Sequence, residues 1–411
     1  MKENKLSLKV TRRDFLKTAA LVGGAAAAPA FLTSCGPGGT DKPIKIGMLV
    51  PNSGPFATNG EDTTTAIKLW IDGHLGGEIA GRKVEYVEED TETNPEVGLQ
   101  KARKLVEQDE VDVLVGVISS GVLMAIRDYI HEAQKLLVVT NAGANAISRG
   151  LKTPYIWRAS MTNWMDSALW PYWAYENLGT RAIPVVLDYT AGYEVRDSMV
   201  YAFQDAGGTI VDEVLVPFPV MGDPAPLITD IASKDADFFY LFNPGGNGVS
   251  FFQAAVEFGL FDQIQMFAAE GSSSEDMLAA YGDPAEGIKS SWNWSFIDDI
   301  PENQAFIKEH IDTYSQPPTS YSVQAYDAAR IISTMIERLE GDTSDVNAMV
   351  DAMAGISFAS PRGPFTLDEK TQNPRQNWYL REAVRHTDGQ LHQKTLLTLG
   401  EVVDPGDDSK G

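Results

Sequence analysis

Residues 111–121 have the sequence VDVLVGVISSG, and the architecture of the whole chain can be worked out from this segment. Its first eight residues are mostly apolar and rich in β-branched side chains, which is typical of a strand buried on both faces of a parallel sheet. The apolar run stops at Ser119, Ser120 and Gly121. Apolar residues then recur every three or four positions as far as Ala133, which predicts a helix that begins just past the serines.

The two serines at this junction have two interpretations. A helix that starts there places their hydroxyl groups beside several unpaired backbone N–H groups, at the positive end of the helix. Such an end can bind a carboxylate or another small polar anion. Serine is also a common cap of helices, so the segment alone leaves capping as the alternative for Ser119 and Ser120.

The same alternation of strand and helix recurs along the chain in two series of four. The expected strands begin near residues 44, 84, 111 and 136, and again near residues 182, 209, 238 and 264. Strands that alternate with helices at this spacing form parallel sheets with right-handed crossovers. Two similar series predict two lobes, so we expect an α/β fold with two doubly wound parallel sheets.

Each expected strand ends in a cluster of small or polar residues. In doubly wound sheets, ligands bind beyond the carboxyl ends of the strands. Two lobes whose strand ends face each other enclose a cleft, which is a favoured place for a small ligand. The candidate ligand-binding residues at these ends are Ser53, Ser119, Ser120, Asn141, Ala142, Gly143, Ala144, Tyr189, Gly192, Tyr193, Gly245 and Glu270.

Residues 1–35 are interpreted as an export signal rather than as part of the fold. The segment 11-TRRDFLK-17 matches the twin-arginine export signature, and 32-LTSC-35 resembles the lipobox of bacterial lipoproteins. Cys35 is the only cysteine, which excludes an intramolecular disulfide and favours a lipid anchor, with an ordinary signal and a leftover cysteine as the alternative. We therefore expect a lipid-anchored periplasmic or cell-surface protein, tethered by the Gly- and Pro-rich residues 36–43.

Charge and motif content exclude several classes of function. The net charge is −24, and about −28 without residues 1–35, so the surface repels nucleic acid and anionic lipid headgroups. The sequence contains no dinucleotide fingerprint, phosphate-binding loop or nucleophile elbow. The five histidines show no metal-ligand pairing on a common helix face and are interpreted as surface residues. We expect neither an enzyme, nor a cofactor, nor a metal site.

The order of several short motifs resembles the type I periplasmic binding proteins of the leucine/isoleucine/valine-binding family. These motifs are SGP at 53–55, GGEIAGRKVEYVEED at 76–90, NP at 94–95, VDVLVG at 111–116, NAG at 141–143 and AEG at 269–271. The likeness extends from about residue 44 to about residue 403. Members of this family are the extracytoplasmic substrate-binding components of ABC importers, so the resemblance implies a membrane permease as partner.

The family resemblance also implies a hinge made of three crossover segments, near residues 159–162, 290–294 and 362–377. Lobe 1 would comprise residues 44–160 with 292–365, and lobe 2 residues 161–291 with 366–403. Residues 404–411 would form a flexible tail.

The resemblance implies an amino acid as ligand, with a branched-chain type favoured. Ser120 and its neighbours would hold the carboxylate, and Glu270 would hold the ammonium group. A buried zwitterion needs such partners, because burying an unpaired charge is very costly. The alternative for Glu270 is an acid in the first turn of a helix at 274–281.

Departures from the family pattern keep other ligands open. Ala144 stands where amino-acid binders supply a threonine hydroxyl, and Ala191 stands where an aromatic residue is common. Trp292 and Trp294 either stack on a larger ligand or belong to the core. An aromatic acid or amide is therefore the alternative ligand, and ligand sensing for a membrane receptor is the alternative function.

Overall fold

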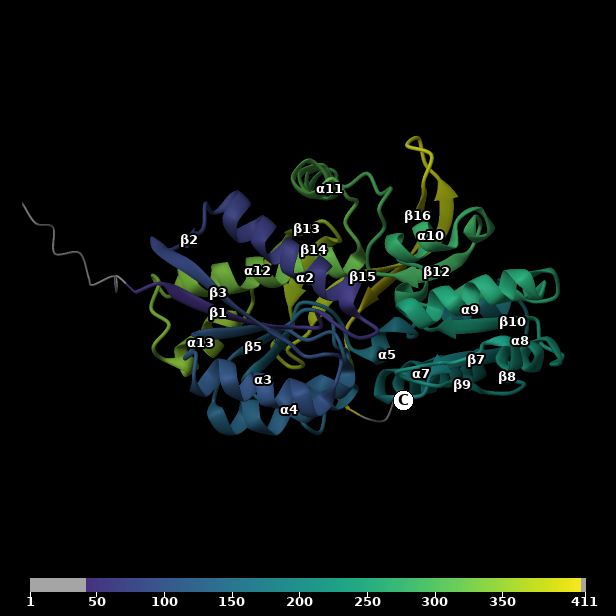
Figure 1. Ribbon diagram of the computed structural model, residues 1–411, viewed down its shortest axis with the longest axis horizontal. Coiled ribbons are helices and arrows are strands. Elements are labelled where there is room, and N and C mark those ends of the chain that lie inside the picture. The colour runs from purple at the N-terminus through teal and green to yellow at the C-terminus, as the bar shows by residue number, and fades with distance from the viewer. Residues whose placement is uncertain (1–41, 408–411) are drawn as a thin grey trace, which may run out of the picture. The chain divides into compact units, whose positions relative to one another are not determined.

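Two β-sheets organise residues 42–407, the part of the chain that this computed structural model describes (Figure 1). The signal segment, Cys35 and nearly all of the expected tether lie outside the described residues. The first sheet has the order β2-β3-β1-β4-β5-β6 and is parallel except for the β2–β3 pair. Its strands are β1 (Ile44–Val50), β2 (Glu78–Ile79), β3 (Arg82–Asp90), β4 (Val113–Gly116), β5 (Leu137–Val139) and β6 (Ile156–Arg158).

Helices cover both faces of the first sheet, with α2 and α12 on one side and α3 and α4 on the other (Figure 1). Successive side chains of β1 point to opposite faces of the sheet, so both faces are apolar and need cover. Ile46 and Met48 pack in the core with α12, whereas Leu49 packs in the core with α3 and α4. The helices of this lobe are α2 (Ala57–Lys68) with its π-helical extension (Leu69–His74), α3 (Pro95–Glu107), α4 (Ser120–Ala133), α11 (Pro301–Tyr314), α12 (Ser320–Arg338) and α13 (Val346–Met353), with a 3-10 turn at Asn145–Ser148.

The second sheet is mixed. Its order is β13-β14-β15-β12-β11-β10-β7-β8, with β9 paired to β7 and β16 paired to β15. Pairs from β7 to β12 are parallel, whereas β13 to β16 pair antiparallel. The strands are β7 (Arg181–Leu187), β8 (Thr209–Ile210), β9 (Val214–Val216), β10 (Phe238–Phe242), β11 (Gln265–Ala268), β12 (Lys289–Trp292), β13 (Ser357–Ser360), β14 (Gly363–Leu367), β15 (Pro374–Arg385) and β16 (Leu391–Val402).

The second sheet also has a core on each face. Ile183 and Val185 of β7 pack with α8, α9 and α10, whereas Ala182 and Val186 pack with α6 and α7. These helices are α5 (Asn163–Asp166), α6 (Trp170–Asn177), α7 (Thr190–Asp205), α8 (Ala225–Ala232), α9 (Gly246–Glu257) and α10 (Glu275–Tyr281), with 3-10 turns at Leu260–Asp262, Glu270–Ser272 and Asp283–Ala285. The predicted α/β fold with two lobes is confirmed. The antiparallel strands β13 to β16 were not predicted.

Strand β4 ends earlier than the apolar run in the sequence. At Gly116 the backbone takes φ +124°, and a Cβ atom there would lie 2.3 Å from the carbonyl oxygen of Leu49, so only glycine fits. Val117 follows with φ +68° and donates its N–H to Leu49 O at 2.8 Å. The backbone therefore leaves the strand direction at Gly116, and α4 begins at Ser120, two residues before the expected start.

A buried ion pair joins the segments that pass between the sheets. The guanidinium of Arg362 donates to Asp327 Oδ2 on α12 at 2.7 and 3.0 Å, and both side chains are almost completely buried. It also donates to the carbonyl of Ala159 at 2.7 Å and to Gln376 Oε1 at 2.8 Å. Gln376 in turn donates to the carbonyl of Ser160 at 2.6 Å. Two of the expected crossover segments are thus held to α12 by one side chain.

The residues near the end of the chain differ from the expected flexible tail. Asp404 is buried, at 2% exposure, and accepts hydrogen bonds from Arg149 at 3.2 and 3.3 Å and from Thr162 at 2.6 Å. Because this carboxylate pairs with a buried arginine, position 404 belongs to the folded part. None of the helices within residues 42–407 combines the length and the apolar composition needed to cross a membrane.

We expect Asp327→Asn to lower the free energy of unfolding by about 3 to 5 kcal/mol, because it leaves the buried Arg362 without its anion. Urea unfolding measures this change. The matched control is Asp312→Asn, which removes an exposed pair with Lys308 on α11 and should cost less than about 0.5 kcal/mol. Equal effects of the two substitutions would contradict the role assigned to Arg362.

Candidate functional site

A pocket lies between the carboxyl ends of the central strands of the two sheets. It contains about 500 Å³ of free space, part of it open to solvent. The first lobe contributes Phe56, Ile118, Ser120, Asn141, Gly143 and Tyr321. The second lobe contributes Tyr189, Ala191, Val195, Phe242, Pro244, Glu270 and Gly271. The connections between the sheets contribute Met161, Asn163 and Asp166, and the end of β12 contributes Trp292.

Five of the residues predicted from the sequence line this pocket, from both lobes. They are Ser120, Asn141, Gly143, Tyr189 and Glu270. These five residues could be predicted because each lies after a parallel strand, and ligands bind beyond the carboxyl ends of such strands.

The other predicted residues do not line the pocket. Ser53 is exposed and donates its hydroxyl to Asp90 at 2.7 Å, and Tyr193 is 37% exposed and bonds to Asp188. Ala142 and Ala144 are fully buried in the core of the first lobe, where their carbonyl groups accept from Arg158.

The two remaining glycines allow close backbone approaches. A Cβ atom on Gly192 would lie 1.8 Å from the carbonyl oxygen of Leu187, within the second lobe. A Cβ atom on Gly245 would lie 2.4 Å from the carbonyl oxygen of Pro55, which belongs to the first lobe. Gly245 therefore allows the two lobes to approach each other and is a contact between them rather than a wall of the pocket.

The start of α4 presents hydrogen-bond donors to the pocket. Ser119 occupies the N-cap position and is buried, yet its side chain makes no capping hydrogen bond within the described part of the chain. The first-turn N–H groups therefore have no side-chain cap. Ser120 Oγ accepts from Asn163 Nδ2 at 3.2 Å, which leaves its hydroxyl hydrogen free to donate to a ligand. The capping interpretation of Ser119 is not supported.

Aromatic side chains form much of the pocket wall. The pocket is lined by the rings of Phe56, Tyr189, Phe242, Trp292 and Tyr321. The ring of Phe218, in the second lobe, stacks on Phe56 with centroids 5.7 Å apart and on Tyr189 with centroids 4.6 Å apart. Rings from both lobes thus pack together at the pocket. Trp292 and Trp294 both belong to the buried core, but only Trp292 also lines the pocket, and Trp294 donates to Asn303 at 2.7 Å.

The charge of Glu270 is balanced inside the protein. Glu270 begins a 3-10 turn, and its Oε2 pairs with Arg381 of β15, which is fully buried. Arg381 also donates to the carbonyl of Trp294 at 2.7 Å and to Ser290 at 3.0 Å. The expectation of a free anion at this position overlooked Arg381. The alternative, a first-turn acid of the following helix, also fails, because α10 begins only at Glu275.

Two buried polar atoms of the pocket-lining residues have no hydrogen-bond partner among residues 42–407. They are Glu270 Oε1, which is an acceptor, and Trp292 Nε1, which is a donor. Unpaired buried polar atoms are costly, so a ligand that pairs them gains free energy of binding.

Asp166 lines the same pocket and was missed by the sequence analysis. It is 3% exposed, and it accepts hydrogen bonds from Tyr240 and from Ser167, the latter at 3.1 Å. Burial raises the pKa of Asp166 to about 6, against the effect of these two hydrogen bonds. Asp166 follows no strand directly, since it ends the short helix α5 in the connection between the lobes.

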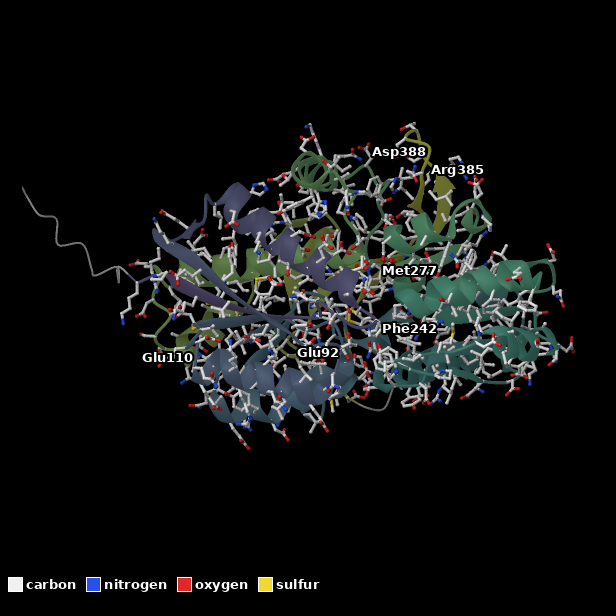
Figure 2. The ribbon with its side chains drawn as sticks, in the orientation of Figure 1. Glu92, Glu110, Phe242, Met277, Arg385 and Asp388 are labelled. Atoms are coloured by element: carbon white, nitrogen blue, oxygen red, sulfur yellow. The ribbon has the colours of Figure 1, made fainter. Side chains whose placement is uncertain are left out.

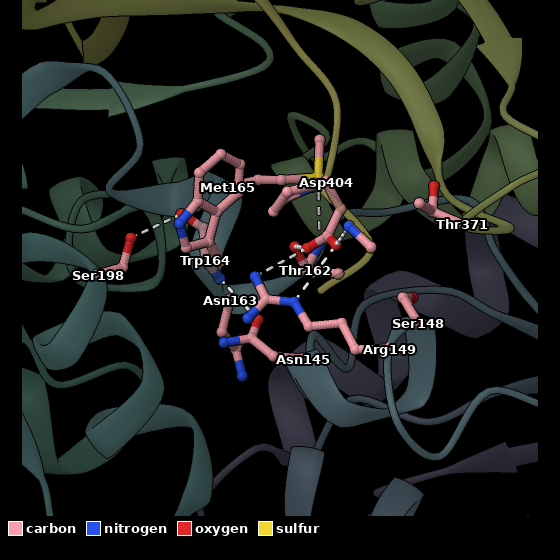
Figure 3. Close-up of polar contacts among 12 residues, drawn as sticks. Asn145, Ser148, Arg149, Thr162, Asn163, Trp164, Met165, Ser198, Thr371 and Asp404 are labelled. Carbon is pink, nitrogen blue, oxygen red and sulfur yellow. Dashed lines mark hydrogen bonds and ion pairs between the residues drawn. The ribbon is translucent and has the colours of Figure 1, made fainter. Parts of the chain in front are cut away.

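The two lobes also meet through hydrogen bonds beside the pocket. Glu194 of α7 accepts from the backbone N–H of Asn145 at 3.0 and 3.1 Å and from Asn163 Nδ2 at 2.6 Å. Figure 3 shows Asn145 and Asn163 next to the Arg149–Asp404 pair. Asn163 therefore connects Ser120 in one lobe with Glu194 in the other.

Two histidines depart from the expected surface positions. His310 and His392 are 3% and 2% exposed, and His392 lies next to His386 and Asp388. The prediction that all five histidines are surface residues was therefore wrong for His310 and His392. The search for metal-ligand pairs covered only residues that share a helix face. The hairpin between β15 and β16 brings His386 and His392 together instead.

Comparison with known proteins agrees with this architecture. A family model described as periplasmic binding protein matches residues 43–390, and a twin-arginine translocation signal model matches residues 9–29. The Leu/Ile/Val-binding protein homolog 6 of Brucella melitensis biotype 1 is 31% identical over 368 residues, which cover 88% of this chain and 93% of that protein.

Solved structures of similar proteins include complexes with aromatic acids. A solute-binding protein of an ABC transporter from R. palustris, in complex with benzoate, is 30% identical with a TM-score of 0.83, and the match covers 90% of this chain and all of that one. Another, from Rhodopseudomonas palustris BisB5 with 3,4-dihydroxybenzoic acid, is 28% identical with a TM-score of 0.84, covering 88% and 99%. A leucine-binding protein from Thermotoga maritima shares the fold, with a TM-score of 0.74 at 19% identity, covering 86% and 98%.

We expect the stability of the ligand-free protein to report the raised pKa of Asp166. Between about pH 4 and pH 6 the unfolded chain loses this proton while the folded protein keeps it, so the contribution of Asp166 to stability falls as the pH rises through that window. The Asp166→Asn variant has no carboxyl group at this position, so it does not lose this stability as the pH rises. Its free energy of unfolding relative to wild type should rise by about 2 to 3 kcal/mol from pH 4 to pH 7, measured by urea unfolding.

The control for this measurement is Asp235→Asn, whose carboxylate is 95% exposed and stays in water. It should show no such change between the two pH values. A constant difference between wild type and Asp166→Asn across pH 4 to 7 would contradict the assignment.

Proposed function

Because the chain belongs to the type I periplasmic binding protein family and is a solute-binding protein of an ABC transporter, we propose that its ligand is an aromatic carboxylic acid. The observation that carries this proposal is the pocket itself, in which aromatic walls meet a helix N-terminus without a side-chain cap. The twin-arginine signal directs the chain to export, so binding takes place outside the cytoplasm.

The carboxylate of the ligand binds at the start of α4 in this proposal. Ser120 donates its hydroxyl, and the first-turn N–H groups add further donors at the positive end of the helix. Arg381 does not serve this purpose, because it is already paired with Glu270. The anion is thus recognised by neutral donors and a helix dipole.

The ring of the ligand stacks among the aromatic side chains of the pocket. Offset or edge-on ring pairs contribute about 0.5 to 1.5 kcal/mol each beyond the area that they bury. Phe56 and Tyr321 come from the first lobe and Tyr189 from the second, so a bound ring contacts both lobes. The similar R. palustris proteins that were crystallised with benzoate and with 3,4-dihydroxybenzoic acid support this class of ligand.

A hydroxyl group on the ring would meet the unpaired polar atoms of the pocket. It can donate to Glu270 Oε1 or accept from Trp292 Nε1, both of which are buried without a partner in the part of the chain that the structure describes. Pairing a buried group in this way avoids the cost of leaving it unsatisfied. Hydroxybenzoates are therefore preferred over benzoate in this proposal.

An amino acid, with a branched-chain type favoured, is the second candidate ligand. Glu270 Oε1 is an acceptor suited to an ammonium group, and the relative from Brucella melitensis is named as a Leu/Ile/Val-binding homologue. Against this candidate, Arg381 already balances the charge of Glu270. Ala144, at the position of the family's threonine, supplies no hydroxyl and does not line the pocket.

The proposed mechanism is hinged closure without chemistry. A ligand binds between lobe 1 (44–160 with 292–365) and lobe 2 (161–291 with 366–403), and contacts such as Asn145 to Glu194 exist only when the lobes meet. The closed form then docks on the permease and releases the ligand unchanged. Lipidation of Cys35, which would keep the protein at the membrane, is part of the same proposal.

We expect Ser120→Ala to weaken the binding of 4-hydroxybenzoate by about 1.5 to 3 kcal/mol, since it removes a hydrogen bond to a charged carboxylate. Isothermal titration calorimetry measures this loss. Ser53→Ala is the matched control, because Ser53 follows the first strand but bonds to Asp90 outside the pocket. Unchanged affinity in Ser120→Ala would exclude the carboxylate site at α4.

A thermal-shift panel separates the two candidate ligands. Benzoate and hydroxybenzoates should raise the melting temperature of the wild-type protein, whereas leucine, isoleucine and valine should not. A ligand at one hundred times its dissociation constant adds about 2.7 kcal/mol of stability. A shift with leucine and none with any aromatic acid would instead select the amino acid.

A further inference from the structure

The hairpin that joins β15 to β16 carries a cluster of side chains that can bind a metal ion. None of them lines the ligand pocket. Its sequence from 386 to 392 is HTDGQLH. Potential ligand atoms of His386, Asp388 and His392 all lie within 4.8 Å of one another. From this geometry we propose that the hairpin binds one divalent transition-metal ion of the Zn²⁺ class through these three side chains.

The turn of the hairpin sets the positions of the three side chains. His386 N–H donates to the carbonyl of Gln390 at 2.8 Å, and Gly389 N–H donates to the carbonyl of His386 at 3.0 Å. Asp388 Oδ1 accepts from the N–H of Gln390 at 2.9 Å. Figure 2 shows Asp388 at this hairpin, close to Arg385 at the end of β15. The chain therefore folds back so that residues six apart in sequence share one site.

The distances within the cluster suit a common ion after small movements of the side chains. His392 Nε2 lies 3.0 Å from Asp388 Oδ2, and His386 Nδ1 lies 3.7 Å from Asp388 Oδ1. Ligand atoms that bind Zn²⁺ at about 2.0 to 2.2 Å in a tetrahedron are separated by similar distances. Two imidazole nitrogens and one carboxylate oxygen form a donor set that favours Zn²⁺ and similar ions over Mg²⁺ or Ca²⁺.

The histidine rings are held in place and leave nitrogen atoms unpaired. The ring of His392 is 2% exposed and stacks on Phe296, with centroids 3.8 Å apart. The Nδ1 atom of His386 is buried and has no hydrogen-bond partner within the described residues, although it faces Asp388. A metal ion would satisfy this atom, which otherwise carries the cost of burial without a partner.

Space beside the cluster allows further ligands from solvent. Asp388 and His392 also line a shallow pocket together with Phe296 and Pro317. Three protein ligands leave a fourth position of a tetrahedral ion open to water. The structural alternative is that Asp388 only stabilises the turn and orients His392, with no ion bound.

The experiment measures Zn²⁺ binding to the full chain without an affinity tag, by equilibrium dialysis with elemental analysis and by calorimetry. We expect one Zn²⁺ per chain and no comparable binding of Mg²⁺. His386→Ala and Asp388→Asn should each lower Zn²⁺ affinity at least about 10-fold, since each removes a ligand. Asp388→Asn keeps an oxygen for the N–H of Gln390, and His386 is half-buried at the end of the hairpin, so both variants should retain the fold.

The matched control is His131→Ala, which removes an exposed histidine of α4 that contacts Thr153. It should bind Zn²⁺ as the wild type does. Co²⁺ absorption spectra add a second readout, because the intense bands of a four-coordinate ion should vanish in His386→Ala and Asp388→Asn but persist in His131→Ala. Absence of Zn²⁺ binding by the wild type, or equal affinity in all three variants, would overturn the proposal. If His386→Ala melts at a lower temperature than the wild type, His386→Gln replaces it in the same comparison.

Discussion

The buried guanidinium of Arg362 is the constraint on which the arrangement of the two lobes depends. Burying a charge is costly unless it is paired and hydrogen-bonded, and Arg362 meets this requirement through Asp327, the carbonyl of Ala159 and Gln376. These partners come from α12 and from the connections between the sheets. Since the guanidinium is satisfied only when all of them converge, the connections between the sheets are fixed relative to α12. The strand ends that line the pocket are positioned as a consequence.

A second buried arginine, Arg381, is paired with a carboxylate of the pocket. Arg381 neutralises Glu270, and Asp166 is a second carboxylate that lines the pocket, with its pKa raised to about 6 by burial. The other groups of the pocket that can contact a ligand are the donors at the start of α4, two unpaired polar atoms and a wall of aromatic rings. In the proposed function a planar acid uses the donors at α4 and the aromatic wall, whereas the ammonium group of an amino acid would need an anion, and Glu270 is already paired with Arg381.

Strand β15 links these features and extends to the histidine cluster. It contains Gln376, which bonds to Arg362, and Arg381, which pairs with Glu270, and it ends at Arg385, directly before His386. One antiparallel strand thus contacts the connections between the sheets, supplies the cation that pairs with Glu270, and leads into the proposed metal site. Its antiparallel pairing with β12 and β16 is what places residues from the end of the chain beside the parallel strands.

The sequence by itself determined the two series of strands and helices, and with them the α/β fold, because apolar periodicity is a local property of the chain. It also located Ser120, Asn141, Gly143, Tyr189 and Glu270, since each directly follows a parallel strand. Only the tertiary structure decided the rest. Asp166 reaches the pocket from a connection between the lobes and Trp292 from the end of β12, Arg381 pairs with Glu270 from an antiparallel strand, and His392 meets His386 across a hairpin. Contacts between residues distant in sequence depend on how elements pack and on which buried charges find partners, and no local pattern encodes that packing.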